Sequence, residues 1–316
     1  MLDLKNRIAY SFGTGNEFSS YFKYDNTFKV TEKGLKQITI VTPDFRIFFY
    51  LNVTLLSVEQ HRTMANLKIE DITLTFGGLA ALSNVSMDIE PGLITSIIGP
   101  NGAGKTSLLN CISGFYHPTS GEIYYKDRKL SKASPHQVSS MGIARAFQNL
   151  ELFSGMTVLD NLLLARHKNL HYNTLQAMFF FGKVSREESK NRRYVEEVID
   201  FMELESYRKH AVGNLSYGIQ KRVEVARALT LAPELLLLDE PMAGMNIEEK
   251  EDMVRFIIDI QQERDATVVL VEHDLGVVMD ISDQIHVLDF GELIGSGSPE
   301  EIVKIPKVIE AYIGEE

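Results

Sequence analysis

Two kinds of hydrophobic pattern recur along the 316-residue chain. A mostly apolar, strand-like run lies at residues 93–98, and short continuous apolar runs lie at residues 235–238 and 267–271. Such runs are typical of parallel strands that are covered on both faces. Residues 65–76 instead alternate apolar and polar side chains, which predicts a half-buried strand. The spacing of these runs, with helical patterns between them, predicts an α/β fold.

The middle of the main domain has a different pattern. From about residue 158 to residue 211 the chain is mainly helical, and strand–helix alternation then continues to the end. We therefore expect an α/β core with an inserted helical subdomain. Residues 1–63 are rich in Phe and Tyr and contain nothing catalytic. They are either a genuine extension of unknown role or an upstream read-through of the reading frame, and we expect the second, with the main domain starting near Met64.

A glycine-rich segment follows the first apolar run. Residues 99–106 read Gly-Pro-Asn-Gly-Ala-Gly-Lys-Thr and lead into a helical pattern. This is the arrangement of a P-loop, whose backbone N–H groups and helix N-terminus bind phosphate groups. Lys105 is expected beside the terminal phosphates, and the Thr106 hydroxyl is expected to ligate Mg²⁺. A glycine-rich turn without a ligand is the alternative.

Two adjacent carboxylates end the second apolar run. Asp239 and Glu240 lie where α/β sheets place their ligands, at the carboxyl end of a buried strand. Asp239 is predicted to hold the metal, in the Walker B role, and Glu240 to orient or deprotonate an attacking water. A plain helix N-cap after the strand is the alternative interpretation.

Three further places in the sequence become candidate nucleotide contacts once a P-loop is present. His273 follows the third apolar run, from where it can reach a γ-phosphate, although a lone histidine is more often structural. Gln148 precedes the helical insertion and offers an amide that can contact Mg²⁺ and water. Ser216 and Gly218 lie in the segment at residues 215–220 that starts a helix continuing through residues 221–229. Such a helix N-terminus is a second phosphate-binding device or an ordinary capped helix.

Taken in order, the P-loop, Gln148, Ser216–Gly218, Asp239–Glu240 and His273 resemble the ATP-binding cassette family. The resemblance covers residues 66–316 and implies a P-loop NTPase cassette: a RecA-like parallel sheet, an antiparallel β subdomain and the helical subdomain at about 149–215. It also implies a head-to-tail dimer, in which Ser216 and Gly218 of one chain cover the γ-phosphate bound to the other. Phe76 falls where the family stacks adenine. The residues expected to bind ATP are therefore Phe76, Gly99, Pro100, Asn101, Gly102, Ala103, Gly104, Lys105, Thr106, Ser107, Ser216 and Gly218.

The same resemblance assigns roles to the remaining groups. Glu240, His273, Gln148 and Lys105 are expected to be catalytic, and Thr106, Gln148 and Asp239 to hold Mg²⁺. One position departs from the family pattern, because Ile219 stands where the signature has a polar residue and Gln220 comes one step later. We expect ATP hydrolysis to survive this change.

The segment around Gln148, the long insertion and the C-terminal tail at about 293–316 are similar to the ATP-binding subunit of branched-chain amino-acid importers. Urea and short-amide importers are close relatives. The resemblance implies permease subunits as membrane partners and, through them, a solute-binding protein. The alternative is a regulatory module that binds ATP, pairs and hardly hydrolyses it.

Composition and charge limit these interpretations. A formal net charge of -11 argues against nucleic acid as a partner, since phosphate backbones require clustered Lys and Arg. The single cysteine excludes a disulfide within the chain, which fits a reducing compartment. No apolar run reaches the ~18 residues that a membrane span needs. We therefore expect a peripheral subunit on the cytoplasmic face of the membrane.

Overall fold

The computed structural model describes residues 28–30, 36–41, 46–51, 67–166 and 183–313. The chain divides into two compact units, residues 1–63 and residues 64–316. In the first unit, β1 (Phe28–Val30), β2 (Lys36–Val41) and β3 (Arg46–Leu51) pair as an antiparallel sheet. Part of the predicted helical subdomain, residues 167–182, lies outside the described residues.

A six-stranded sheet forms the centre of the second unit. Its order is β13-β12-β6-β11-β10-β9, and all neighbours are parallel except β12 and β13. The strands span β6 (Ile94–Ile98), β9 (Ile143–Ala146), β10 (Leu235–Asp239), β11 (Thr267–Val271), β12 (Gln284–Asp289) and β13 (Glu292–Gly297). The three continuous apolar runs are thus adjacent parallel strands, as predicted.

A second, antiparallel sheet has the order β5-β4-β7-β8. It consists of β4 (Leu67–Phe76), β5 (Leu79–Ile89), β7 (Ser120–Tyr125) and β8 (Arg128–Lys129). Buried and exposed side chains largely alternate along β4, so the predicted half-buried strand is confirmed. A parallel core with an antiparallel sheet is the predicted fold class.

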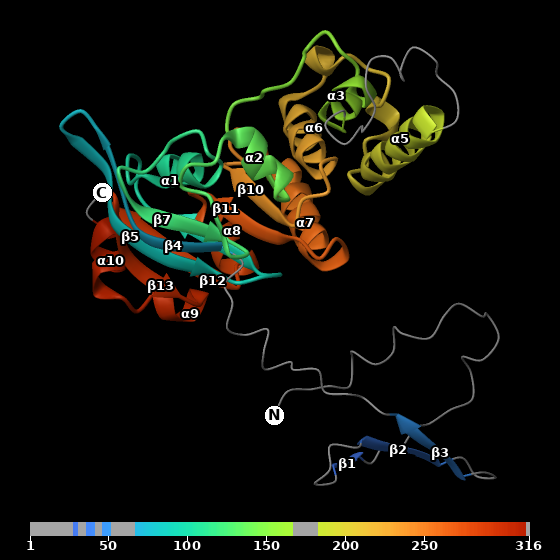
Figure 1. Ribbon diagram of the computed structural model, residues 1–316, viewed down its shortest axis with the longest axis horizontal. Coiled ribbons are helices and arrows are strands. Elements are labelled where there is room, and N and C mark those ends of the chain that lie inside the picture. Colours follow the sequence, from blue (N-terminus) through green and yellow to red (C-terminus); the bar gives the residue numbers. More distant parts are fainter. Residues whose placement is uncertain (1–27, 31–35, 42–45, 52–66, 167–182, 314–316) are drawn as a thin grey trace. The chain divides into compact units, whose positions relative to one another are not determined.

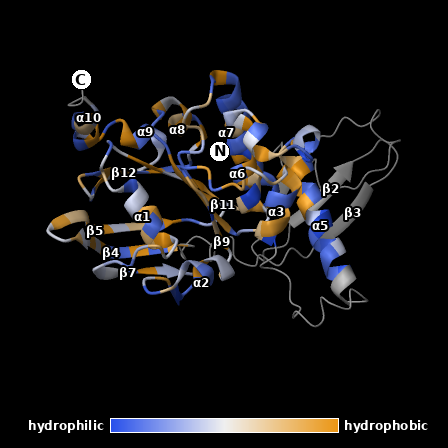
Figure 2. Cartoon of the chain, turned by 90° about the horizontal axis from the view of Figure 1, so that it is seen from above, coloured by the Kyte–Doolittle hydropathy of each residue, from blue (hydrophilic) through white to orange (hydrophobic). Residues whose placement is uncertain are grey.

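The helices flank these sheets. They are α1 (Lys105–Ile112), α2 (Pro135–Ser140), α3 (Val158–Arg166), α5 (Lys183–Phe201), α6 (Tyr217–Leu229), α7 (Ile247–Glu263), α8 (Leu275–Ile281), α9 (Pro299–Ile302) and α10 (Pro306–Ile313). Figures 1 and 2 place α3, α5 and α6 together at the end of the domain away from β4 and β5. Within the described residues, no helix is both long and apolar enough to cross a bilayer.

Two apolar cores cover the two faces of the parallel sheet. Along β10, Leu235 and Leu237 pack with α1 and the antiparallel sheet, whereas Leu236 and Leu238 pack with the helices α3, α5, α6 and α7. β11 divides its side chains between the two cores in the same way. The period of two therefore commits successive residues to opposite layers. This burial on both faces explains why the runs are largely apolar, with Thr95, Ser96 and Thr267 as their buried polar residues.

Candidate functional site

The P-loop joins β6 to α1 and is shaped by glycines that accept positive φ. Gly99 has φ +146°, and a Cβ there would lie 1.9 Å from the Leu288 carbonyl oxygen. Gly104, the N-cap of α1, has φ +100°, and its Cβ would lie 2.6 Å from the Ala81 carbonyl oxygen. Gly102 has φ +83° with open space at its Cβ position. The loop is thus packed closely against the backbone of neighbouring segments at Gly99 and Gly104, and it is open at Gly102.

Lys105 is the first residue of α1, and its side chain reaches back into the loop. Its Nζ donates hydrogen bonds to the carbonyl oxygens of Gly99, at 2.6 Å, and Pro100, at 2.9 Å. Lys105 is buried, while Thr106 beside it is exposed and Ser107 is half-buried. A positive charge and a helix N-terminus therefore converge on the loop, which favours an anion there.

Phe76, the predicted adenine contact, ends β4 and is 48% exposed. The rings of Phe76 and Tyr116 pack edge to face, with their centroids 5.2 Å apart. About half of Phe76 is therefore accessible, as stacking on a nucleobase requires.

Asp239 ends β10 in a buried position. Its Oδ2 accepts a hydrogen bond from Arg145 at 2.7 Å, and the two side chains are 1% and 5% exposed. Its Oδ1 is buried and has no hydrogen-bond partner among the described residues. Burial lowers the pKa of Arg145, and the hydrogen bond to Asp239 opposes that shift. The pair leaves one carboxylate oxygen without a donor.

The oxygen donors predicted for Mg²⁺ fit that ion. Mg²⁺ prefers hard oxygen ligands, and the buried Oδ1 of Asp239 offers one. The Thr106 hydroxyl and the Gln148 amide are on exposed residues of the P-loop helix and of the segment after β9.

Glu240 and Gln148 meet directly. The Nε2 of Gln148 donates to the Oε2 of Glu240 at 2.7 Å. Glu240 has φ +49°, a backbone conformation that costs a residue with a side chain about 1–3 kcal/mol. Its backbone N–H donates to the Val271 carbonyl oxygen at 2.9 Å, which holds the turn after β10 against β11. Two of the predicted catalytic residues are therefore in contact.

A buried lysine lies beneath this contact. Lys221 of α6 is 1% exposed, and its Nζ donates to the carbonyl oxygens of Gln148, at 2.5 Å, and Glu240, at 3.4 Å. Burial lowers the pKa of Lys221, and the nearby carboxylates oppose the shift. One cation thus ties α6 to both residues.

His273 lies two residues beyond the end of β11, and its side chain is 60% exposed. Its Nδ1 is 3.8 Å from the Oε2 of Glu272, which is buried. Glu272 accepts hydrogen bonds from the backbone N–H groups of Met242 and His273, at 3.0 and 3.2 Å. Burial raises the pKa of Glu272. The carboxylate fastens the loop after β10 to the loop that carries the histidine.

The N-terminus of α6, the second helix end predicted to bind phosphate, has an acidic neighbour. Ser216 caps α6, and its Oγ accepts from the Ile219 N–H at 3.4 Å. Gly218 is buried, and a Cβ placed on it would lie 2.2 Å from the Glu249 carboxylate. Glu249 also accepts from the Asn246 N–H in the capping box of α7. A negative charge therefore lies at the N-terminus of α6, which by itself favours anions.

Sequence reasoning missed four residues of this region: Arg145, Lys221, Glu249 and Glu272. A signal existed for Arg145, because a lone cation inside the apolar strand at residues 143–146 requires a partner. Lys221 and Glu249 lie on amphipathic helices among other charges, where nothing in the pattern singles them out. Glu272 directly precedes His273, and no sequence pattern distinguishes it from an ordinary charged residue at the end of a strand.

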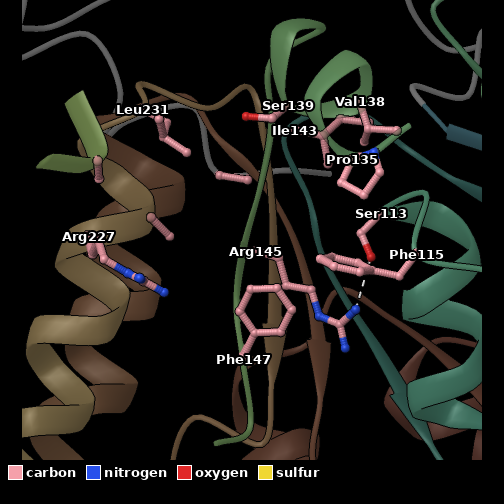
Figure 3. Close-up of a pocket in the computed structure, with 13 residues that line it drawn as sticks. Ser113, Phe115, Pro135, Val138, Ser139, Ile143, Arg145, Phe147, Arg227 and Leu231 are labelled. Carbon is pink, nitrogen blue, oxygen red and sulfur yellow. Dashed lines mark hydrogen bonds between the residues drawn. The ribbon is translucent and has the colours of Figure 1, made fainter. Parts of the chain in front are cut away.

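A groove lies between the core and the helical layer. It has a volume of about 290 Å³ and is lined by residues of α2, β9, α3 and α6, by Ser113 and Phe115 just after α1, and by Phe147 and Leu231. Figure 3 shows Arg145 and Phe147 between the side that carries Phe115 and the side that carries Arg227. The Phe115 and Phe147 rings are 5.6 Å apart, edge to face, and the Arg145 guanidinium lies 4.8 Å from the Phe147 centroid. The groove therefore borders the ion pair of Asp239.

The parallel sheet carries the P-loop, a carboxylate pair and a histidine at one edge, and an antiparallel sheet and a helical layer lie beside it. This combination defines a cassette-type nucleotide-binding protein. The family model described as "ABC transporter" matches residues 82–243, and "Branched-chain amino acid ATP-binding cassette transporter" matches residues 292–316. The chain belongs to the ABC transporter family, and its identification as an ATPase subunit of that family is confirmed.

Characterised relatives agree with this membership. The chain is 39% identical over 249 residues to the high-affinity branched-chain amino acid transport ATP-binding protein BraF of Pseudomonas aeruginosa. It is equally similar to LivG of Escherichia coli, which bears the same description. Each match covers 79% of this chain and 98% of the relative.

Solved structures agree as well. A nucleotide-free ATP-binding cassette from an ABC transporter matches with a TM-score of 0.69 and 32% identity, over 79% of this chain and all of that one. A dimeric cassette in a post-hydrolysis state, bound to ADP and Pi, matches with a TM-score of 0.63 and 28% identity, over 74% of this chain and 98% of that one. The predicted cassette fold is confirmed.

Proposed function

We propose that this chain hydrolyses ATP to power an importer of branched-chain amino acids. The observation that carries the proposal is the contact of Gln148 with Glu240 beside Asp239 and the P-loop, in a chain 39% identical to two branched-chain amino acid transport proteins. In our proposal residues 64–316 form this motor, with the helical subdomain at about 149–215 and the tail at about 293–316. Residues 1–63 form a separate unit, to which we assign no role.

The chain's own groups divide the work. Lys105 and the N-terminus of α1 bind the phosphates, and Phe76 receives the adenine. Thr106, Gln148 and Asp239 would hold Mg²⁺, which would neutralise charge on the phosphates. Because Gln148 donates its Nε2 to Glu240, its Oε1 remains for the metal. Glu240 accepts the proton of the attacking water or orients it.

The second half of the phosphate site comes from another chain. A single chain carries two helix N-termini suited to phosphate, those of α1 and α6. We propose a head-to-tail dimer in which Ser216 and Gly218 of one chain face the γ-phosphate held by the other, with His273 beside it. The similar cassette that is dimeric and bound to ADP and Pi supports the pairing of two chains. Loss of the γ-phosphate removes the contacts that hold the chains together.

Replacing Glu240 tests the hydrolytic role. Glu240→Gln keeps the side-chain shape and the hydrogen bond to Gln148 but cannot accept a proton. We expect turnover to fall by about 10²–10⁴-fold, while ATP binding persists and the chain becomes a stable dimer. Phosphate release and light scattering with Mg²⁺ and ATP measure these outcomes. Unchanged turnover would refute the role of Glu240, and a monomer under these conditions would refute the dimer.

The groove between the core and the helical layer is proposed as the docking site for a permease segment. Its lining is mostly apolar, and Phe115 is 52% exposed at its edge. It adjoins Arg145 and Phe147, only a few residues from Gln148, so a segment seated there lies next to the catalytic loop. In this way the chain associates with the membrane peripherally, through its permease.

Phe115→Arg tests this docking, because it adds a charge and bulk at the edge of the groove. We expect permease-stimulated turnover in vesicles to fall to the level of the chain without permease. The matched control is Ile309→Arg, which alters a 41% exposed apolar residue on α10. Equal stimulation of both variants would exclude the groove as the docking site.

The solute is decided by the partner proteins. Stimulation of turnover by a solute-binding protein loaded with leucine, isoleucine or valine supports the proposal. Stimulation only by a urea- or amide-loaded protein points to the related importers instead. Binding of ATP without phosphate release, even with permease, would identify a regulatory module in which Ile219 replaces a polar signature residue.

A further inference from the structure

The most deeply buried ion pair near the proposed metal site joins two strands. Arg145 lies in β9 and Asp239 ends β10, and their side chains meet at 2.7 Å while only 5% and 1% exposed. Taking two charges out of water is costly unless the geometry of the pair and its other hydrogen bonds compensate. A pair retained at this depth therefore requires a reason beyond stability.

The guanidinium is held from a second side by the helix after the P-loop. The Nη1 of Arg145 donates to the Asn110 Oδ1 at 2.7 Å and to the Ser113 Oγ at 2.9 Å. Figure 3 shows the Ser113 contact as a dashed line. Phe147 covers the guanidinium at 4.8 Å. A single planar group thus links α1, β9 and β10 through N–H donors held at fixed angles, whereas a lysine would supply a compact charge on a flexible stem.

These contacts of Arg145 fix the orientation of the Asp239 carboxylate. Arg145 holds Oδ2, while Oδ1 is buried with no hydrogen-bond partner in the described part of the chain. We infer that Arg145 is a positioning residue that fixes the Asp239 carboxylate so that Oδ1 alone is presented to Mg²⁺ or to a water bound to it. The inference rests on the proposed metal role of Asp239. Groups that orient a metal ligand in this way change metal affinity without contacting the metal.

The decisive variant is Arg145→Lys, which keeps the positive charge and loses the planar fork. Binding of a fluorescent ATP analogue is measured while Mg²⁺ is titrated, and again in EDTA. We expect the Mg²⁺ concentration at half-saturation to rise about tenfold or more, with the affinity in EDTA unchanged. A purely structural role predicts that both affinities change together or that neither changes.

Two further variants serve as controls, one for nonspecific effects of an Arg→Lys change and one for misfolding of Arg145→Lys. Arg166→Lys removes a part-buried arginine that hydrogen-bonds Asn191 and the Thr230 carbonyl oxygen in the helical layer, and it should leave the Mg²⁺ titration unchanged. If Arg145→Lys does not melt cooperatively, Ser113→Ala decides, because it removes one hydrogen bond from the guanidinium and keeps the ion pair. We expect it to raise the Mg²⁺ half-saturation by about threefold.

Asp239→Asn separates the inference from the proposal on which it rests. If that variant retains the wild-type Mg²⁺ dependence, the metal role of Asp239 is wrong. If Asp239→Asn loses the dependence while a folded Arg145→Lys keeps it within twofold of the wild type, the positioning role of Arg145 is overturned. For an Arg145→Lys that does not fold, an unchanged titration of Ser113→Ala overturns it.

Discussion

At the scale of single residues, charges outside the recognised motifs hold the motif residues in place. Lys221 fastens the backbone of Gln148 and Glu240, and Glu272 fastens the loop that carries His273. The strained backbone of Glu240, with φ +49°, persists because hydrogen bonds on either side determine it. The geometry of the proposed catalytic groups therefore depends on charged residues outside the motifs.

Glu249 gives the residue-scale prediction. Its carboxylate lies against Gly218 at the N-terminus of α6, where we propose that the partner's γ-phosphate binds. Two negative groups at one helix end repel each other, and such terminal charges contribute about 0.3–1 kcal/mol. Glu249→Gln removes the charge and can still accept from the Asn246 N–H, so we expect ATP-driven dimers to tighten by about threefold.

The measurement is the dimer dissociation constant with Mg²⁺ and ATP, in the Glu240→Gln background so that ATP persists. Glu248→Gln is the matched control, since Glu248 is the neighbouring exposed carboxylate of the same helix turn. An equal gain in both variants would attribute the effect to net charge. Weaker dimers after Glu249→Gln would show that the carboxylate assists the interface.

At the scale of helices and strands, the central parallel strands could be predicted because their sequences are mostly apolar along their whole length. The runs that became β6, β10 and β11 contain mostly apolar residues, because both faces of each strand are covered. The P-loop was predictable for a related reason, since its glycines are required by φ +146° at Gly99 and +100° at Gly104. These constraints are local, so one stretch of sequence contains them.

The ion pair of Arg145 was not predictable, because it depends on register between distant strands. β9 pairs with β10 in parallel, with Arg145 opposite Leu237, two residues before Asp239. The period of two then places the arginine on the same side as the carboxylate. The two residues are 94 positions apart, and no pattern within either strand specifies that register. The contact of Glu249 with Gly218 likewise arises only from the packing of α7 against α6.

At the scale of the whole domain, the parallel sheet separates an apolar core under the antiparallel sheet from one under the helical layer. A third cluster joins β12 with α8, α9 and α10. His286 lies in the middle of β12, opposite Ile97 of the P-loop strand, and is 2% exposed. A titratable group at this position links the stability of the sheet to pH.

Burial lowers the pKa of His286 from 6.5 to about 4, partly offset by Asp88. His286 therefore becomes protonated below pH 6.5 in the unfolded chain, but only below about pH 4 in the folded chain. The contribution of His286 to the free energy of unfolding is complete above pH 6.5 and is lost as the pH falls, by about 3 kcal/mol at pH 4.

Urea denaturation between pH 7 and pH 4 measures this decline in the free energy of unfolding. His286→Leu, which has no proton to take up, should show a decline about 3 kcal/mol smaller than the wild type. Parallel pH profiles of the two proteins would mean that His286 titrates normally in the folded state, and that acid acts on the carboxylates instead.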